Sequence, residues 1–151
     1  MIEGVKIKEL IKRHDDRGWF SEILRDDEKL LSRFGQASIT KTYPQVVKAF
    51  HWHKKQDDLW FCVSGNIQVV LYDRRPRSKS KGEANIFYLG DDNAQAVFIP
   101  KGIAHGYRVL GQKEATLVYF TTKSYNPSAP DEERIPFDDP SINFDWQTKN
   151  R

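Results

Sequence analysis

Short segments of strand-forming residues dominate this sequence, and turn-forming residues separate most of them. No segment between them is long enough to form the crossover helix that a parallel α/β sheet requires. The pattern therefore predicts an all-β fold, with antiparallel strands arranged as a sandwich or jelly roll. The expected strands cover residues 5–11, 19–24, 37–43, 46–53, 59–65, 66–73, 84–90, 96–100, 105–111 and 115–122.

Residues 26–35 are the one helical candidate in the chain. Acidic residues come first, the apolar side chains of Leu30, Leu31 and Phe34 share a face, and Gly35 follows as a stop signal. Several expected strands, for example residues 59–63, are apolar on both faces, which indicates burial in the core and against a partner subunit. The Pro- and Asp-rich tail is expected to wrap the surface.

Length and composition indicate one domain, residues 1–151, of ordinary polarity. The net charge of +3 is mild, and the basic run 74–83 contains no aromatic residue, so we expect a solvated loop and no nucleic-acid partner. No apolar run approaches the roughly 20 residues that a membrane helix needs. The first residues lack a secretory apolar core, so we expect a cytoplasmic protein. The single Cys62 excludes an internal disulfide.

The histidines form the most informative pattern in the sequence. His51 and His53 are two residues apart on an expected strand, so their side chains point to the same face. If that face lines the interior, His105 from a later strand can join them. The spacing of these two histidines, Asp58 and Gly65 resembles the first motif of the cupins, with aspartate in place of the usual glutamate.

The stretch from Pro100 through Gly102 to His105 resembles the second cupin motif, in the correct order. The two motifs together imply a cupin-type jelly-roll barrel of antiparallel strands, in agreement with the strand pattern. Three imidazoles and one carboxylate are suitable ligands for Zn, Fe, Mn or Ni. A histidine in a closed apolar barrel can instead remove a proton next to a carbonyl group. A third interpretation is that these histidines are hydrogen-bonded core or interface groups.

Six blocks of the sequence resemble, in order, those of the dTDP-4-dehydrorhamnose 3,5-epimerase family. They cover nearly the whole chain and lie at residues 15–22, 36–53, 63–75, 98–107, 118–127 and 137–146. The resemblance implies a cupin-type homodimer that acts without a metal or other cofactor. Its substrate would be a nucleotide-linked 4-keto-6-deoxy sugar, expected to carry dTDP.

The resemblance also assigns roles to individual residues. His51 corresponds to the catalytic base, Tyr119 to the acid on the opposite face of the sugar, and His105 to a polar group of the pocket. The positions that bind the nucleotide correspond to Arg17, Glu22, Gln36, Lys48 and Tyr125, of which Arg17 and Glu22 are expected to come from the partner subunit. The ketone at C4 acidifies the protons at C3 and C5, so a base can form an enolate that an acid on the other face reprotonates.

The sequence departs from the family at several of these positions. The family usually has glutamine in place of His53, lysine in place of the substrate-binding candidate Asp58, and arginine in place of Lys48. The family's aspartate that orients the catalytic histidine follows the tail block, and this chain ends at Arg151 without one. We therefore expect Asp57 or Asp58 to fix the tautomer of His51.

Residues 48–65 are also similar to the dTDP-4-keto-6-deoxyhexose 3,4-ketoisomerases, in which paired histidines move a proton between neighbouring carbons. This similarity makes His53 a further catalytic candidate. We rank epimerisation first, because that resemblance spans the chain and includes Tyr119. Ketoisomerisation is the second hypothesis. A metal-binding cupin and a non-catalytic sugar-nucleotide-binding protein are the remaining ones.

Overall fold

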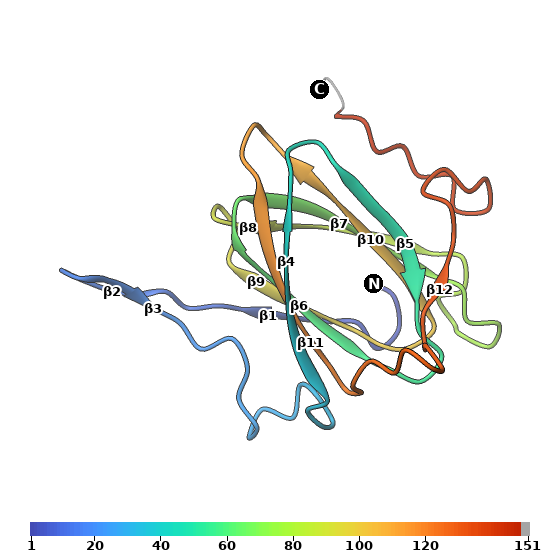
Figure 1. Ribbon diagram of the computed structural model, residues 1–151, viewed down its shortest axis with the longest axis horizontal. Helices are drawn as coiled ribbons and strands as arrows, with labels where there is room; N and C mark the ends of the chain where they lie inside the picture. Colours follow the sequence, from blue (N-terminus) through green and yellow to red (C-terminus); the bar gives the residue numbers. More distant parts are fainter. Residues whose placement is uncertain (149–151) are drawn as a thin grey trace.

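The computed structural model describes residues 1–148. Every regular element assigned within these residues is a β-strand. One five-stranded antiparallel sheet has the order β1-β9-β6-β11-β4, and the other has the order β12-β5-β10-β7-β8 (Figure 1). The first sheet contains β1 (Lys6–Glu9), β4 (Gln36–Thr42), β6 (Asp58–Ser64), β9 (Gln95–Ile99) and β11 (Ala115–Thr121). The second contains β5 (Val47–Trp52), β7 (Asn66–Asp73), β8 (Ala84–Gly90), β10 (Ile103–Leu110) and β12 (Glu133–Arg134).

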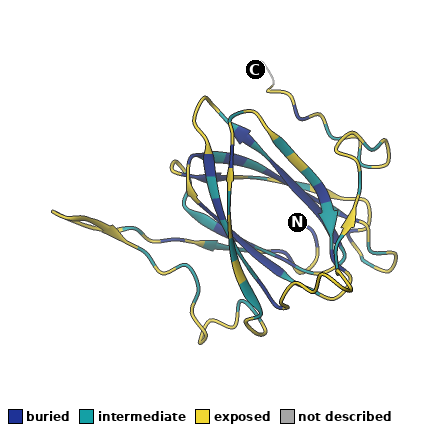
Figure 2. Cartoon of the chain, viewed as in Figure 1, coloured by how far each residue is buried: buried dark blue, intermediate teal, exposed yellow. Residues whose placement is uncertain are grey.

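The two sheets enclose one apolar core, as the alternating sequence pattern predicts. In β10 and β7 most residues are buried, and the register pairs Val109 with Ile67 and Tyr107 with Val69 (Figure 2). The predicted all-β jelly-roll architecture is confirmed.

The helix predicted at residues 26–35 is wrong, because the segment consists of turns and bends. Lys29 has a positive φ of 50°, which a right-handed helix does not allow. Leu30 and Leu31 instead pack on the outer face of the first sheet, against Leu59 and Phe61. These tertiary contacts bury the leucines without a helical backbone. Within the described residues no helix is long and apolar enough to cross a membrane.

Strand β6 is buried on both faces, but residues of its own chain cover the outer face, where a partner subunit was expected. Its outward side chains are covered by Ile23, Leu24 and the leucines of the turn segment, which belong to the same chain. The tail covers the outer face of the second sheet in the same way, because Trp146 and Phe144 pack against Phe50. The expected wrapping tail is therefore present.

A two-stranded hairpin of β2 (Arg13–Asp15) and β3 (Gly18–Phe20) projects from the barrel as an arm (Figure 1). All six residues of its strands are exposed, including Trp19 and Phe20 (Figure 2). The strand predicted at 19–24 ends at Phe20, because the chain leaves the hairpin there and returns to the sheet. The arm thus carries apolar surface that the rest of its own chain does not cover.

Candidate functional site

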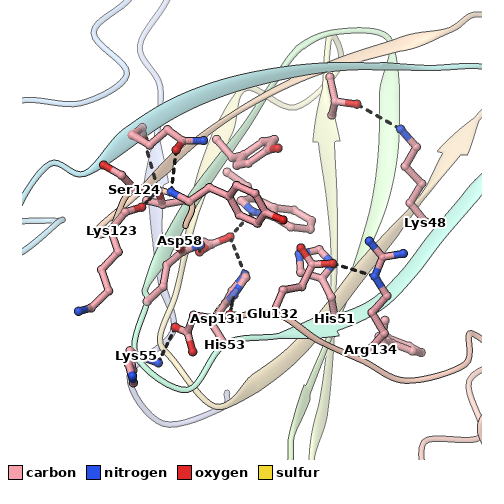
Figure 3. Close-up of a pocket in the computed structure, with 18 of the residues that line it drawn as sticks. Lys48, His51, His53, Lys55, Asp58, Lys123, Ser124, Asp131, Glu132 and Arg134 are labelled. Atoms are coloured by element: carbon pink, nitrogen blue, oxygen red, sulfur yellow. Dashed lines mark hydrogen bonds and ion pairs between the residues drawn. The ribbon is translucent and has the colours of Figure 1, made fainter. Parts of the chain in front are cut away.

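A cavity of about 910 Å³ opens between the two sheets and is closed on one side by the tail (Figure 3). Strands β4, β6 and β11 supply one wall, β5 supplies the other, and residues 123–134 supply the rim. Seven of the ten predicted site residues line it, namely Gln36, Lys48, His51, His53, Asp58, Tyr119 and Tyr125.

His51 and His105 meet where β5 and β10 pair. They are direct register partners, and their ring centroids are 4.1 Å apart in an edge-to-face arrangement. Gly106 allows this close approach, because a Cβ atom there would lie 2.3 Å from the Cβ of Ala49. The Nδ1 of His105 donates to the carbonyl of Ile103 at 2.9 Å, so its Nε2 carries the lone pair and points inward.

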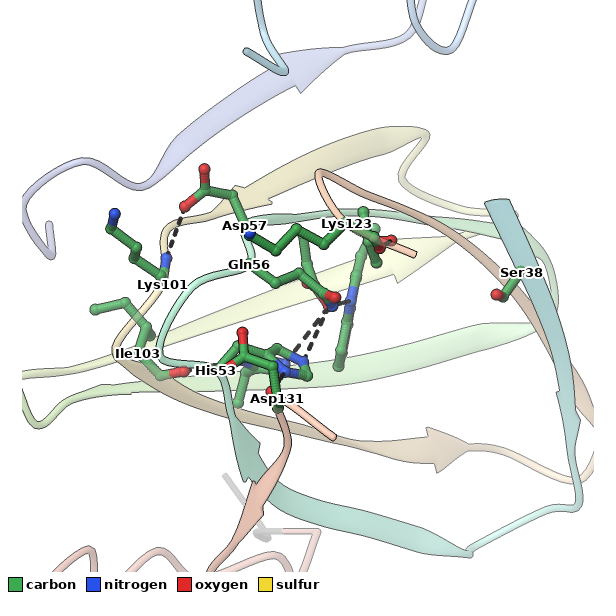
Figure 4. Close-up of polar contacts among 12 residues, drawn as sticks. Ser38, His53, Gln56, Asp57, Lys101, Ile103, Lys123 and Asp131 are labelled. Carbon is green, nitrogen blue, oxygen red and sulfur yellow. Dashed lines mark hydrogen bonds and ion pairs between the residues drawn. The ribbon is translucent and has the colours of Figure 1, made fainter. Parts of the chain in front are cut away.

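His53 follows the end of β5 and is held by the tail. Its Nδ1 donates to the carbonyl oxygen of Asp131, and the Asp131 carboxylate accepts the backbone N–H groups of Lys54 and Lys55 (Figure 4). In the neutral form of the ring the Nε2 of His53 is then the acceptor, as in His105. The contact with Asp131 connects the last part of the chain to the histidine motif.

Asp58 is the first residue of β6 and is 2 % exposed. Its Oδ1 accepts a hydrogen bond from Gln56 at 2.8 Å, and its Oδ2 accepts one from the indole N–H of Trp60 at 3.2 Å. The same Oδ2 lies 3.8 Å from the Nε2 atoms of both His53 and His105. The carboxylate thus faces the histidines without hydrogen bonding to them.

Burial keeps the central imidazoles neutral. Desolvation lowers the pKa of His51 and of His105 well below the usual histidine range, and the neighbouring histidines lower it further. The negative charges of Asp58 and Glu132 oppose the shift at His51. At neutral pH His51 therefore has a free lone pair, and two carboxylates lie close enough to stabilise its protonated form.

No hydrogen bond between His51 and either expected aspartate occurs in the described chain, so the predicted orientation of His51 by Asp57 or Asp58 is wrong. The Asp57 carboxylate accepts the backbone N–H of Lys101 at 2.9 Å and lies away from the histidines (Figure 4). Asp58 belongs to the cluster but contacts His53 and His105. Glu132, which sequence reasoning missed, lies beside His51 and accepts a hydrogen bond from Arg134 at 2.8 Å (Figure 3).

Tyr119 reaches the cavity from the opposite sheet. Leu117, Tyr119 and Thr121 alternate along β11 and line the cavity, whereas Val118 and Phe120 point outward. Tyr119 is the register partner of Trp60 on β6. The tyrosine and His51 therefore face one cavity from different sheets.

Cationic side chains line the cavity together with the carboxylates of Asp58, Asp131 and Glu132. Lys48 donates to Thr40 at 3.1 Å, and the Gln36 amide oxygen accepts the backbone N–H of Tyr125 at 2.9 Å. Sequence reasoning missed the cations Arg33, Lys55, Lys123 and Arg134, which also line it. Lys55 and Lys123 lie close in sequence to His53 and Tyr125. This closeness was the signal that could have identified them as site residues.

Arg17 and Glu22 are not brought to the cavity. Arg17 is at the tip of the arm and pairs with Asp15 at 2.6 Å, and Glu22 pairs with Arg25 at 2.8 Å. Both lie outside the residues that line the cavity.

Four residues of the cluster could hold a metal ion. One ligand atom from each of His51, His53, Asp58 and His105 can be chosen so that all four lie within 4.8 Å of one another. Imidazole nitrogen and carboxylate oxygen together suit zinc and similar ions.

The chain is similar to known proteins of one family. Residues 1–151 match the family described as dTDP-4-dehydrorhamnose 3,5-epimerase. The chain is 61% identical to the spore coat polysaccharide biosynthesis protein SpsL of Bacillus subtilis (strain 168), with full coverage of both chains. It is 35% identical to dTDP-4-dehydrorhamnose 3,5-epimerase of Escherichia coli (strain K12), covering 96% of this chain and 81% of that one.

Solved structures show the same relationship. A dTDP sugar isomerase from Desulfovibrio desulfuricans G20 superimposes with a TM-score of 0.89 at 31% identity, covering 96% of this chain and 92% of that one. The Legionella pneumophila epimerase in complex with dTDP-4-keto-L-rhamnose gives 0.87 at 30% identity, covering 99% and 82%. The chain therefore belongs to the dTDP-4-dehydrorhamnose 3,5-epimerase family, whose members are metal-independent isomerases.

Proposed function

We propose that this protein epimerises a nucleotide-linked 4-keto-6-deoxy sugar by moving protons next to the C4 ketone. The observation that carries the proposal is the placement of His51 and Tyr119 on different sheets facing one cavity. Inversion of a carbon centre needs a base on one face and an acid on the other.

The first step is removal of a proton by the neutral imidazole of His51. The buried environment disfavours the imidazolium that results, and the carboxylates of Glu132 and Asp58 offset part of this cost. The substrate becomes an enolate, and Tyr119 returns a proton to the opposite face. Glu132 and Asp58 thus support His51 through their charge, and not through the hydrogen bond expected from Asp57 or Asp58.

The cations that line the cavity support binding of the nucleotide diphosphate. Lys48, Lys55 and Lys123 line the cavity beside Arg33 and Arg134, and such side chains neutralise phosphate charge. The Legionella relative is complexed with a dTDP-linked sugar, and we infer the same nucleotide here. Gln36 and Tyr125 are assigned to the nucleotide because they adjoin these cations at the rim.

We infer a homodimer from the apolar surface that the chain leaves open. Ile39 on edge strand β4 is 70% exposed and Tyr43 beyond it is 72% exposed, while the arm exposes Trp19 and Phe20. A second copy packed on this side would cover the apolar residues. In such a dimer the arm can deliver Arg17, and the segment that follows it Glu22, to the partner's cavity. Cytoplasmic localisation stays a prediction.

Incubation with dTDP-4-keto-6-deoxyglucose in deuterated water tests the proposal. We expect deuterium at C3, C5 or both in an epimerised product, measured by NMR spectroscopy. The Tyr119→Phe variant should still exchange deuterium but form about a hundred-fold less inverted product, because the second face loses its acid. Absence of exchange in the wild-type protein would refute epimerisation.

Ketoisomerisation is the second candidate, and the position of His53 favours it. The His53 and His51 ring centroids are 5.5 Å apart, so two imidazoles could serve neighbouring carbons. The same incubation separates the two reactions, because a ketoisomerase would move the ketone from C4 to C3. A ketone that stays at C4 while deuterium enters would exclude this candidate.

A further inference from the structure

Three hydrogen-bond acceptors face one another inside the barrel. The Nδ1 atoms of His53 and His105 donate to backbone carbonyls, so in the neutral form of each ring the Nε2 atom carries the lone pair. Both Nε2 atoms point to the Oδ2 atom of Asp58, which lies 3.8 Å from each of them.

Such an arrangement is unfavourable unless a cation occupies it. His105 is 2 % exposed, and its Nε2 is a buried atom with no hydrogen-bond partner in the described chain. Buried polar atoms are normally satisfied, and an exception calls for an explanation. An electron-pair acceptor placed between the three groups would satisfy all of them at once.

The surrounding contacts have the form of a metal site. A histidine that binds a metal usually donates its other ring N–H to a carbonyl or carboxylate, and a metal-binding carboxylate is itself hydrogen-bonded. His53 and His105 meet the first condition through Asp131 and Ile103. Asp58 meets the second through Gln56 and Trp60.

The distances also suit a metal ion. Zinc binds imidazole and carboxylate at about 2.0–2.2 Å in tetrahedral geometry, so two of its ligand atoms lie about 3.3–3.6 Å apart. The separations of 3.8 Å are slightly longer than this, so a small side-chain movement would bring these atoms onto one ion. His51, which packs against His105, can provide the fourth ligand atom after a similar movement, because the four ligand atoms lie within 4.8 Å of one another.

We propose that His53, Asp58, His105 and His51 bind one divalent transition-metal ion of the zinc type. Three imidazoles select such an ion over Mg²⁺ and Ca²⁺, which prefer oxygen ligands. The family's reaction needs no metal, so the site is an addition to it. A bound ion would occupy the lone pair of His51, and zinc would therefore inhibit proton abstraction.

Calorimetric titration of chelator-treated, dialysed protein with Zn²⁺ tests the site without substrate. We expect saturable binding of one ion per chain, confirmed by native mass spectrometry, and no binding of Mg²⁺. Asp58→Asn and His53→Gln should each weaken zinc binding by about ten-fold or more. The matched controls Asp57→Asn and His14→Gln should bind as the wild type does, because both residues lie outside the cluster.

Circular dichroism establishes that each variant is folded. Absence of saturable zinc binding in the wild type would overturn the site, as would unchanged affinity in both cluster variants. Neither result would bear on epimerisation, which is measured separately by deuterium exchange in the chelator-treated protein. Saturating zinc should lower that exchange about ten-fold or more, and unchanged exchange would remove His51 from the ligand set.

Discussion

The same local pair, an aspartate followed two residues later by an arginine, occurs once in the barrel and once in the arm. Asp73 is fully buried, and its Oδ2 accepts hydrogen bonds from Arg75 at 2.8 Å and from Ser80 at 2.7 Å. In the arm, Arg17 pairs with Asp15 at 2.6 Å, but the Arg17 side chain is 84% exposed. The same spacing therefore gives a buried ion pair in the barrel and a solvent-exposed arginine in the arm.

This difference separates the two sets of predicted site residues. The barrel positions its side chains within one chain, through register pairs and hydrogen bonds to backbone. The arm presents Arg17 to solvent, and the segment that follows it presents Glu22, each held only by neighbours in sequence. We therefore expect substitutions in the barrel to affect chemistry or stability, and substitutions in the arm to affect substrate binding.

The largest effect is expected at His51. Replacement by Asn should lower deuterium exchange about a thousand-fold, because general-base catalysis contributes rate factors of this order. The thermal unfolding midpoint should change little, since no hydrogen bond of the described chain depends on this side chain. Exchange close to the wild-type rate in a folded variant would show that another group is the base.

The next largest effect is expected at Asp73. Asp73→Asn should lower the free energy of unfolding by about 2–3 kcal/mol, because it leaves the Arg75 guanidinium without its buried partner. Urea unfolding at neutral pH measures this change. An unfolding free energy equal to that of the wild type would mean that the Asp73–Arg75 pair stabilises the protein no more than the Asp15–Arg17 pair does.

The contribution of Asp73 should depend on pH. Burial acts to raise the pKa of Asp73, but hydrogen bonds from Arg75, Ser78 and Ser80 outweigh it and hold the pKa below its usual range. The folded state therefore binds the proton more weakly than the unfolded state, in which the pKa is about 3.9. The stabilisation is fully present above that value and is lost as the pH falls through the lower folded pKa. The difference between wild type and Asp73→Asn should shrink below about pH 4.

A smaller effect is expected at Arg17. Arg17→Ala should raise KM about ten-fold with little change in kcat, because a charge-assisted contact to the substrate is lost before the chemical step. Steady-state kinetics across substrate concentrations gives both values. A fall in kcat with unchanged KM would indicate that the arm participates in catalysis.

The smallest effect is expected at Asp15. Asp15→Asn should leave the urea midpoint unchanged, because the pair is exposed and solvent screens it. It is the matched control for Asp73→Asn, since the arginine stands at the same distance along the chain. A clear fall in the urea midpoint would show instead that the exposed Asp15–Arg17 pair contributes to the stability of the protein.

Local patterns predicted the strands and the histidine cluster well. His51 and His53 share a face by strand geometry, and His105 joins them because β10 pairs with β5. The helix at 26–35 failed because contacts of Leu30 and Leu31 with the distant strand β6 decide the backbone there. Asp131 and Glu132 were missed for a similar reason. Their place depends on where a tail without regular alternation returns to the barrel.

The position of Asp131 has a consequence for the order in which the protein is made. The last long strand of the barrel is complete at Thr121, whereas the carbonyl that orients His53 belongs to Asp131. On the ribosome, every long strand of the barrel is therefore synthesised before the residue that orients His53. A chain that ended at residue 130 would have all of these strands but an unoriented histidine, so the presence of the strands in a shortened product would not report a finished site.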